Sequence, residues 1–267
     1  MLNAPKRLVL LYAFIYFYDI NINTIYVLYV LPVLSMEPIK GLVSVIIPTY
    51  NRYELLNHSI KSVLANTYKE VEVIVINDCS TDPRYYSGEL EKYDKTTVIH
   101  LPVNMRIKHN APSAQGMTKN YGLESARGEW IAFLDDDDFF LENKLEAQLS
   151  YMLYNNCNFS STNMYVINHN SIGTDKLDFN IISKYFQSDI PQVFNYNIIH
   201  RTNYINNSSV IIHNSIVNKA GKFNIIQYED WDYWKRVIQY ADCLYINEPL
   251  VYYTKTINNS ESVRYYN

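Results

Sequence analysis

The chain has 267 residues, and its 48% hydrophobic content is enough to bury the core of one large α/β domain or two small ones. Its formal net charge of −4 argues against a nucleic-acid-binding protein, which usually carries a basic face. The three cysteines lie far apart without a C-x-x-C pair, and neither G-x-G-x-x-G nor G-x-x-x-x-G-K-[ST] occurs, which disfavours a disulfide scaffold, a structural zinc site and the common glycine loops for NAD or ATP.

Two apolar runs near the start of the chain, residues 8–18 and 25–34, are separated by a short polar stretch that includes Asp19. Each run is shorter than the about 20 apolar residues of a membrane span, and joining them would bury Asp19. We therefore predict an N-terminal extension, residues 1–41, that associates with a membrane. A segment packed on the domain and an extension outside the fold stay open as alternatives. No small-residue cleavage site is evident, which argues against a secretory signal. Because the odd number and wide spacing of the cysteines argue against disulfides, we expect a cytoplasmic protein.

From residue 42 onwards, short β-branched runs alternate with helical patterns. The expected strands cover residues 42–47, 71–76, 97–101, 130–134, 207–212, 244–246 and 250–253, and the expected helices begin near Asn51, Glu89, Lys119 and Gln227. We expect Asn51 and Glu54 to form a capping box. Strands alternating with helices favour an α/β fold with a mostly parallel central sheet flanked by helices. We predict one domain over residues 42–257 and a loose tail over residues 258–267.

Polar loops follow three of these strands, at residues 49–52, 77–82 and 135–138. The carboxyl ends of parallel strands meet at one edge of a sheet, and ligands of open α/β sheets bind there. We therefore expect these three separate loops to line a single crevice.

Four consecutive aspartates, Asp135 to Asp138, end the strand at residues 130–134. Four like charges repel one another, and a bound cation is the usual compensation. Mg²⁺ and Mn²⁺ prefer oxygen ligands and often reach a protein through one or two carboxylates, with substrate phosphates supplying the rest. The alternative is a solvated acidic turn in which Asp138 caps the next helix.

Glu229 and Asp230 precede an apolar helical face. A carboxylate at this place can take a proton from an attacking hydroxyl, so the pair is a candidate general base. The alternative is structural, because acidic residues stabilise a helix N-terminus as caps and through the helix dipole.

Three further side chains are expected in the crevice. Asp78 lies just beyond a strand and can accept hydrogen bonds from a nucleobase or ribose, or else form an Asx-turn. Arg52 and Lys119 can balance the charge of a diphosphate, or else are surface cations. The histidines show no metal-ligand spacing.

Taken together, these motifs resemble the inverting glycosyltransferases of family 2, of bacterial surface-polysaccharide type, which have the GT-A fold. The segments that carry the resemblance are residues 43–52 (VSVIIPTYNR), 73–82 (VIVINDCSTD), 119–122 (KNYG), 126–138 (ARGEWIAFLDDDD), 229–232 (EDWD) and 248–253 (EPLVYY). They occur in the order that the family shows.

The resemblance implies a nucleotide-binding half followed by an acceptor-binding half. It implies an enzyme that uses a nucleotide-sugar donor, in our expectation a UDP-sugar, with a glycan or lipid-linked acceptor and no nucleic acid. It also implies peripheral contact with the cytoplasmic face of the membrane. By the same resemblance Pro48, Tyr50 and Asp78 line the base and ribose, with Asp135 and Asp136 beside them. Asp137 holds Mn²⁺ or Mg²⁺, and Asp230 is the base with Glu229 beside it.

Several positions depart from the family pattern. Lys119 stands where arginine is common, Cys79 where glycine is common, and Thr256 near a usual histidine, while glycines are scarce in residues 104–115. Two other functions remain as alternatives. One is a non-catalytic nucleotide-sugar-binding module, and the other is a nucleotidyltransferase on a related fold.

Overall fold

The computed structural model describes residues 9–10, 32–33, 37–111, 113–169, 179–187 and 190–255. Most of the predicted N-terminal extension, all of the predicted tail and Thr256 lie outside these residues. The chain divides into two compact units, Met1–Glu37 and Pro38–Asn267. In the first, β1 (Val9–Leu10) pairs antiparallel with β2 (Pro32–Val33). Among the described residues, no helix has the length and apolar character that crossing a bilayer requires.

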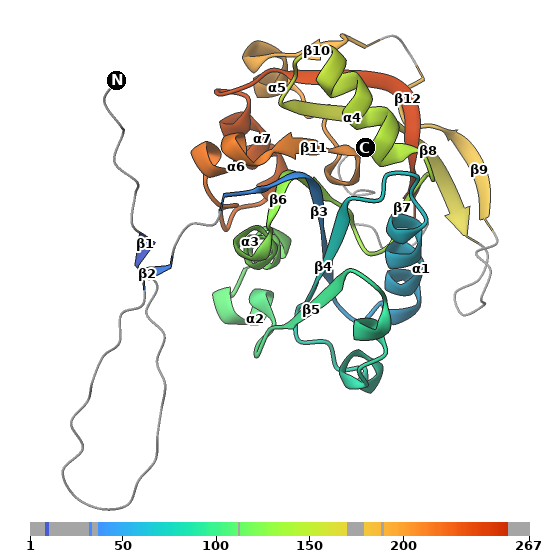
Figure 1. The fold of residues 1–267 in the computed structure, drawn as a ribbon, viewed down its shortest axis with the longest axis vertical. Coiled ribbons are helices and arrows are strands. Elements are labelled where there is room, and N and C mark those ends of the chain that lie inside the picture. Colours follow the sequence, from blue (N-terminus) through green and yellow to red (C-terminus); the bar gives the residue numbers. More distant parts are fainter. Residues whose placement is uncertain are drawn as a thin grey trace, which may run out of the picture. The chain divides into compact units, whose positions relative to one another are not determined.

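The second unit is built on a ten-stranded sheet (Figure 1). Its N-terminal half contains β3 (Ile39–Thr49), β4 (Val71–Asn77), β5 (Thr96–His100) and β6 (Gly128–Phe133). These four strands are mutually parallel in the order β6-β3-β4-β5. The predicted α/β fold with a mostly parallel central sheet is therefore confirmed.

The sheet continues beyond β6 with both orientations. The strands there are β7 (Phe139–Phe140), β8 (Phe159–His169), β9 (Phe179–Lys184), β10 (Val193–Phe194), β11 (Ile211–His213) and β12 (Cys243–Thr254). Strand β11 lies antiparallel between β6 and β8, whereas β8 and β12 are parallel. The two late strands that we expected around Pro249 are one strand, β12, with a register shift at that proline.

Helices cover both faces of the sheet (Figure 1). They are α1 (Tyr53–Leu64), α2 (Met105–His109), α3 (Gln115–Ser125), α4 (Lys144–Tyr154), α5 (Tyr196–Arg201), α6 (Asn214–Ala220) and α7 (Glu229–Val237), with short 3₁₀ turns η1 (Pro83–Tyr86), η2 (Leu90–Lys92) and η3 (Asn207–Ser209). Alternation along β3 explains the two layers. Val45 and Ile47 pack with α1 and α4, while Ile46 faces the cluster that contains Trp234 of α7.

The register of the parallel strands brings the polar loops together. Thr49 at the end of β3 pairs with Asn77 at the end of β4, and Ile46 pairs with Phe133 at the end of β6. The loops that follow these strands therefore leave the sheet at the same edge, as the sequence predicts.

Several local predictions were wrong. Asn51 does not cap α1, because its backbone is left-handed (φ 53°) and its side chain accepts a hydrogen bond from the Thr81 N–H. The 207–212 run begins as the 3₁₀ turn η3, and only Ile211–His213 is a strand. Helix α3 begins at Gln115, four residues before the expected start, and the segment near Glu89 forms only the 3₁₀ turn η2.

Candidate active site

A cleft of about 530 Å³ opens at the carboxyl edge of the parallel strands. Its walls come from the loops after β3, β4 and β6, from α3, and from the start of α7. All of the site residues predicted from the sequence line it: Pro48, Tyr50, Arg52, Asp78, Lys119, Asp135, Asp136, Asp137, Glu229 and Asp230. The expected convergence on one crevice is therefore confirmed, while the role of each residue stays a prediction.

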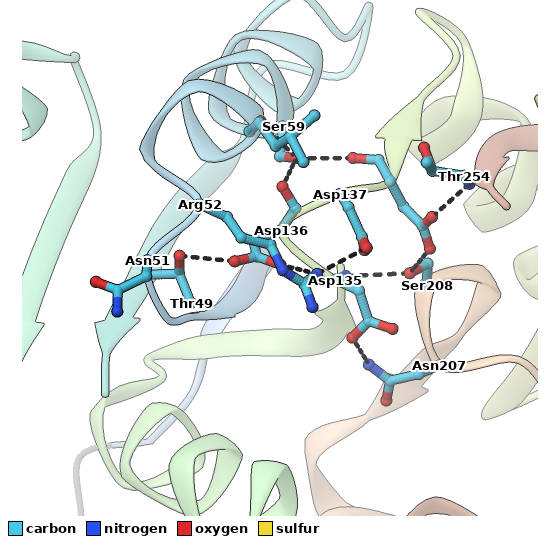
Figure 2. A network of polar contacts seen from close by, with 12 residues as sticks. Thr49, Asn51, Arg52, Ser59, Asp135, Asp136, Asp137, Asn207, Ser208 and Thr254 are labelled. Atoms are coloured by element: carbon cyan, nitrogen blue, oxygen red, sulfur yellow. Dashed lines mark hydrogen bonds and ion pairs between the residues drawn. The ribbon is translucent and has the colours of Figure 1, made fainter. Parts of the chain in front are cut away.

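Two of the four aspartates are held inside the protein (Figure 2). Asp136 accepts a hydrogen bond from Thr49 Oγ1 at 2.7 Å and forms an ion pair with Arg52 Nη1 at 2.9 Å. Asp138 accepts from Ser208 Oγ at 2.5 Å and from the backbone N–H of Thr254 at 2.9 Å. Asp138 therefore connects β12 to the four consecutive aspartates Asp135 to Asp138 (the acidic run). It does not cap α4, whose N-cap position is held by another residue.

The other two aspartates lie at the surface of the cleft. Asp135 accepts from Asn207 Nδ2 at 3.0 Å, and Asp137 pairs with Arg52 Nη1 at 2.7 Å (Figure 2). Of the two carboxylates that pair with Arg52, Asp137 is the more exposed, at 22% of its side chain against 7% for Asp136.

Burial changes the charge of the acidic run. It raises the pKa of Asp136 to about 7, against the opposing effect of the Arg52 guanidinium, and the charge of Asp137 adds to the rise. Burial also raises the pKa of Asp138 well above its ordinary range, helped by Asp137 and Asp135. Partial protonation and Arg52 together reduce the repulsion that four neighbouring carboxylates would otherwise produce.

The donor set fits an open cation site that a ligand completes. Among the described residues no cluster of three or more His, Cys, Asp or Glu side chains is placed to hold a metal by itself. Asp137 supplies a carboxylate in the cleft, and Asn207 Oδ1 is a buried oxygen without a hydrogen-bond partner in the part of the chain described. Mg²⁺ and Mn²⁺ are commonly held by one or two carboxylates together with substrate phosphates, which this arrangement permits.

Asp78 lines the cleft and is almost fully buried. Its carboxylate accepts from the Met105 N–H at 2.8 Å and from Asn104 Nδ2 at 2.9 Å, so it also anchors the start of α2. Burial raises its pKa, and the Met105 N–H opposes this. The local turn that we considered for Asp78 is made by Asn77, whose Oδ1 accepts from the Ser80 N–H.

Glu229 and Asp230 begin α7 but do not cap it. The N-cap is Tyr228 in a left-handed conformation (φ 58°). Glu229 packs so closely on α3 that a Cβ on Gly116 would lie 2.7 Å from its Cγ. Its carboxylate lies 3.9 Å from Lys119 Nζ.

Asp230 lines the same cleft as Asp135, Asp136 and Asp137. Its Oδ1 accepts from the Trp231 N–H at 2.7 Å, and its Oδ2 accepts from Asn203 Nδ2 at 3.4 Å. Burial raises the pKa of Asp230, while the positive charge of Lys119 opposes the rise. A carboxylate with a raised pKa is better matched to proton abstraction near neutral pH than an ordinary one.

Sequence reasoning missed several residues of the cleft wall, among them Thr49, Asn104, Arg106, Ser113 and Asn207. Thr49 and Asn104 position aspartates that we had selected. The sequence contained one signal for Asn207. It lies in a polar segment next to a β-branched run, as the residues of the other three polar loops do.

Comparison with known proteins shows which sequences the chain is similar to. The family model described as "Glycosyl transferase family 2" matches residues 44–208. A UDP-Glc:alpha-D-GlcNAc-diphosphoundecaprenol beta-1,3-glucosyltransferase, WfgD of Escherichia coli, is 33% identical over 198 residues, 74% of this chain and 70% of the relative. The putative teichuronic acid biosynthesis glycosyltransferase TuaG of Bacillus subtilis is 30% identical over 226 residues, 84% of this chain and 82% of the relative.

The fold also matches solved structures. The S. aureus TarS 1–349 structure in complex with UDP-GlcNAc superposes with a TM-score of 0.64 at 20% identity. The match covers 83% of this chain and 60% of that one. Against the longer TarS chain the match covers 37% of its length, and a Rickettsia conorii glycosyltransferase is matched over 20%. At this level of identity the structural likeness establishes the fold, which is the GT-A type expected from the sequence.

Proposed function

The chain belongs to glycosyltransferase family 2, and on this premise we propose that it transfers a sugar from a UDP-sugar to a hydroxyl group of a lipid-linked glycan, with inversion at the anomeric carbon. The single observation that carries this proposal is the cleft itself. It places the Asp230 carboxylate and the acidic run on the walls of one cavity at the carboxyl edge of the sheet. A nucleotide-sugar transferase needs both a base and a site for a diphosphate.

The proposed reaction is a direct displacement. Asp230 takes the proton of the acceptor hydroxyl, and the oxygen attacks the anomeric carbon on the face opposite the nucleotide. The bond from that carbon to the diphosphate oxygen breaks, and the diphosphate leaves with the electron pair. One displacement inverts the configuration, and no bond between sugar and enzyme forms.

The diphosphate needs positive charge as it leaves. A Mn²⁺ or Mg²⁺ ion held by Asp137 would supply that charge when bound. Arg52 is the guanidinium nearest the acidic run on the cleft wall, so we assign it to the diphosphate as well. Lys119 is assigned a different task, since it is buried beside Glu229 and lowers the pKa of Asp230.

The nucleotide is assigned to the floor between β3 and β4. Pro48, Tyr50 and Asp78 line this part of the cleft, and Tyr50 is exposed on its wall. Asp135 and Asp136 line the same cleft, and we assign the ribose and the diphosphate of the donor to their part of it.

The relatives support the choice of substrates. The name of the E. coli relative states a UDP-glucose donor and a diphosphoundecaprenol-linked acceptor, and the TarS structure contains UDP-GlcNAc. We therefore propose a UDP-hexose donor and a lipid-linked saccharide acceptor. We place the enzyme at the cytoplasmic face of the membrane, where a soluble donor and a lipid-linked acceptor meet.

The test is a screen of UDP-, GDP- and dTDP-sugars with and without Mn²⁺, read as thermal stabilisation and as nucleotide released on turnover. The proposal expects Mn²⁺-dependent stabilisation by UDP-sugars and release of UDP when an acceptor is present. Release of UMP would favour a nucleotidyltransferase instead. Stabilisation without turnover on any lipid-linked acceptor would favour a binding module.

A further inference from the structure

One nitrogen of Arg52 contacts two carboxylates of the acidic run (Figure 2). Its Nη1 lies 2.9 Å from Asp136 Oδ1 and 2.7 Å from Asp137 Oδ2. We propose that Arg52 makes cation binding conditional on the donor. Without nucleotide it neutralises Asp137, and the donor diphosphate attracts it away so that a divalent cation can bind there. This inference rests on the proposed function of the cleft.

Arg52 and a cation compete for the same carboxylate. Asp137 Oδ2 accepts a hydrogen bond from Arg52 Nη1. If this oxygen bound a metal while Arg52 stayed in place, the guanidinium and the metal would lie close together. Two unit positive charges about 4 Å apart repel by about 4 kcal/mol at the effective dielectric of a protein surface, and a divalent ion increases this. Arg52 therefore has to leave Asp137 before a cation binds tightly.

The local structure allows that movement. The backbone of Arg52 is fixed, because its N–H donates to Tyr85 OH at 3.0 Å and its carbonyl accepts from the Leu56 N–H at 2.9 Å. Its side chain is 43% exposed, against 22% for Asp137 and 7% for Asp136. The guanidinium can therefore turn into the cleft on a fixed base while both aspartates stay in place.

The acidic run stays ordered when Arg52 leaves. Asp136 keeps its hydrogen bond from Thr49 Oγ1, and Ser59 Oγ lies within hydrogen-bond distance of the backbone carbonyls of Asp136 and Asp138 (Figure 2). The departing positive charge is replaced by the cation, and the guanidinium gains the diphosphate, which accepts charge-assisted hydrogen bonds well. Donor and cation should therefore bind cooperatively, with Arg52 carrying the coupling.

The experiment measures the Kd of Mn²⁺ by calorimetry and by the electron paramagnetic resonance signal of free Mn²⁺, each with and without saturating UDP. The proteins are the wild type, the neutral variants Arg52→Gln and Arg52→Ala, and Arg52→Lys, which keeps the charge. Arg84→Gln is the matched control, because Arg84 pairs with Asp82 and Glu54 and is not part of the cleft wall.

The wild type should bind Mn²⁺ weakly alone and at least about tenfold more tightly with UDP. Both neutral variants should bind Mn²⁺ alone about tenfold more tightly than the wild type, and UDP should then add little. In Arg52→Lys, UDP should still tighten Mn²⁺ binding by most of the wild-type factor. In Arg84→Gln it should tighten Mn²⁺ binding by the full wild-type factor.

Three results separate this inference from the proposed function. If UDP promotes Mn²⁺ binding equally in the wild type and in the neutral variants, Arg52 does not control the site and the inference fails alone. The same holds if wild-type Mn²⁺ affinity is independent of UDP. If the wild type binds no Mn²⁺ even with UDP, the proposed metal–diphosphate site itself is wrong. If one neutral variant does not fold, the other makes the first comparison, and the last two results need only the wild type.

Discussion

Lys119 Nζ lies 3.9 Å from Glu229 Oε1, and both side chains are almost completely withdrawn from solvent. The pair joins α3 to the first turn of α7. Because Lys119 also lowers the pKa of Asp230, this ion pair connects the packing of two helices to the proton affinity of the proposed base. Glu229 therefore belongs, in our proposal, to the positioning of Lys119 and not to proton transfer.

Replacing Lys119 should change the pH dependence of the reaction. Asp230 acts as a base only when deprotonated, and the charge of Lys119 opposes the rise in its pKa caused by burial. Lys119→Met should therefore move the acidic limb of the kcat/KM profile to higher pH. Lys119→Arg should leave the limb nearly in place. Lys222→Met removes an exposed pair with Glu124 and serves as the control. An unchanged limb in Lys119→Met would refute the coupling.

Asp230→Asn should remove the base and leave the cleft intact. We expect kcat to fall by about 10² to 10⁴. Binding of UDP, measured by calorimetry, should stay within about twofold of the wild type, because the amide keeps the shape of the carboxylate. Asp232→Asn is the matched control on the same helix, where Asp232 pairs with Arg236 and is not on the cleft wall. Wild-type turnover by Asp230→Asn would sink the assignment of the base.

Gly116→Ala tests the contact between α3 and α7. The added Cβ would lie 2.7 Å from Glu229 Cγ and 2.8 Å from Phe223 Cβ, so one helix has to shift. Overpacking of this kind costs about 1 to 3 kcal/mol, against a gain of up to about 1 kcal/mol in helix propensity. We expect reduced stability in urea and a larger loss of kcat than of UDP affinity. Ser125→Ala, at the exposed end of the same helix, should leave kcat unchanged. Equal stability in urea and equal kcat of the two variants would contradict this prediction.

Asp138→Asn should stabilise the protein at neutral and alkaline pH. Burial raises the pKa of Asp138 in the folded state, with Asp137 and Asp135 adding to the rise and Ser208 and Thr254 opposing it. The unfolded chain loses this proton near pH 4, whereas the folded protein keeps it to higher pH, so the wild type loses stability as pH rises above about 4. The variant has no such loss.

Urea unfolding of both proteins between pH 4 and 8 measures this difference. The stability of Asp138→Asn relative to the wild type should grow with pH and reach about 1 to 3 kcal/mol. In the variant the amide oxygen can accept from the Thr254 N–H, and the amide nitrogen can donate to Ser208 Oγ, so both partners remain hydrogen-bonded. A difference that is constant with pH, or that shrinks as pH rises, would show that Asp138 is ionised in the folded protein.

Much of the site was accessible from the sequence because it depends on local patterns. β-Branched runs that end in polar loops predict parallel strands, and the geometry of a parallel sheet places those loops at one edge. This is why Asp78 and Asp137, which lie far apart in the chain, could be assigned to one cleft in advance, whereas Asp230 was assigned to it through the family resemblance. Helix starts were less accessible. Asn51 satisfies a distant loop, and Tyr228 begins α7 in a conformation that no pattern indicated.

The sequence by itself determined the family, through the resemblance of its motifs. It also determined the edge of the sheet at which the polar loops meet, because strand periodicity places the end of each strand. Only the tertiary structure decided what each carboxylate does. Asp138 is held by partners 70 and 116 residues away, Asp136 by Thr49, and Glu229 by Lys119. Four identical aspartates in a row carry no signal that distinguishes them. They differ only because packing buries two of them and leaves Asp137 beside Arg52 in the cleft, where burial and neighbouring charge set the properties of each group.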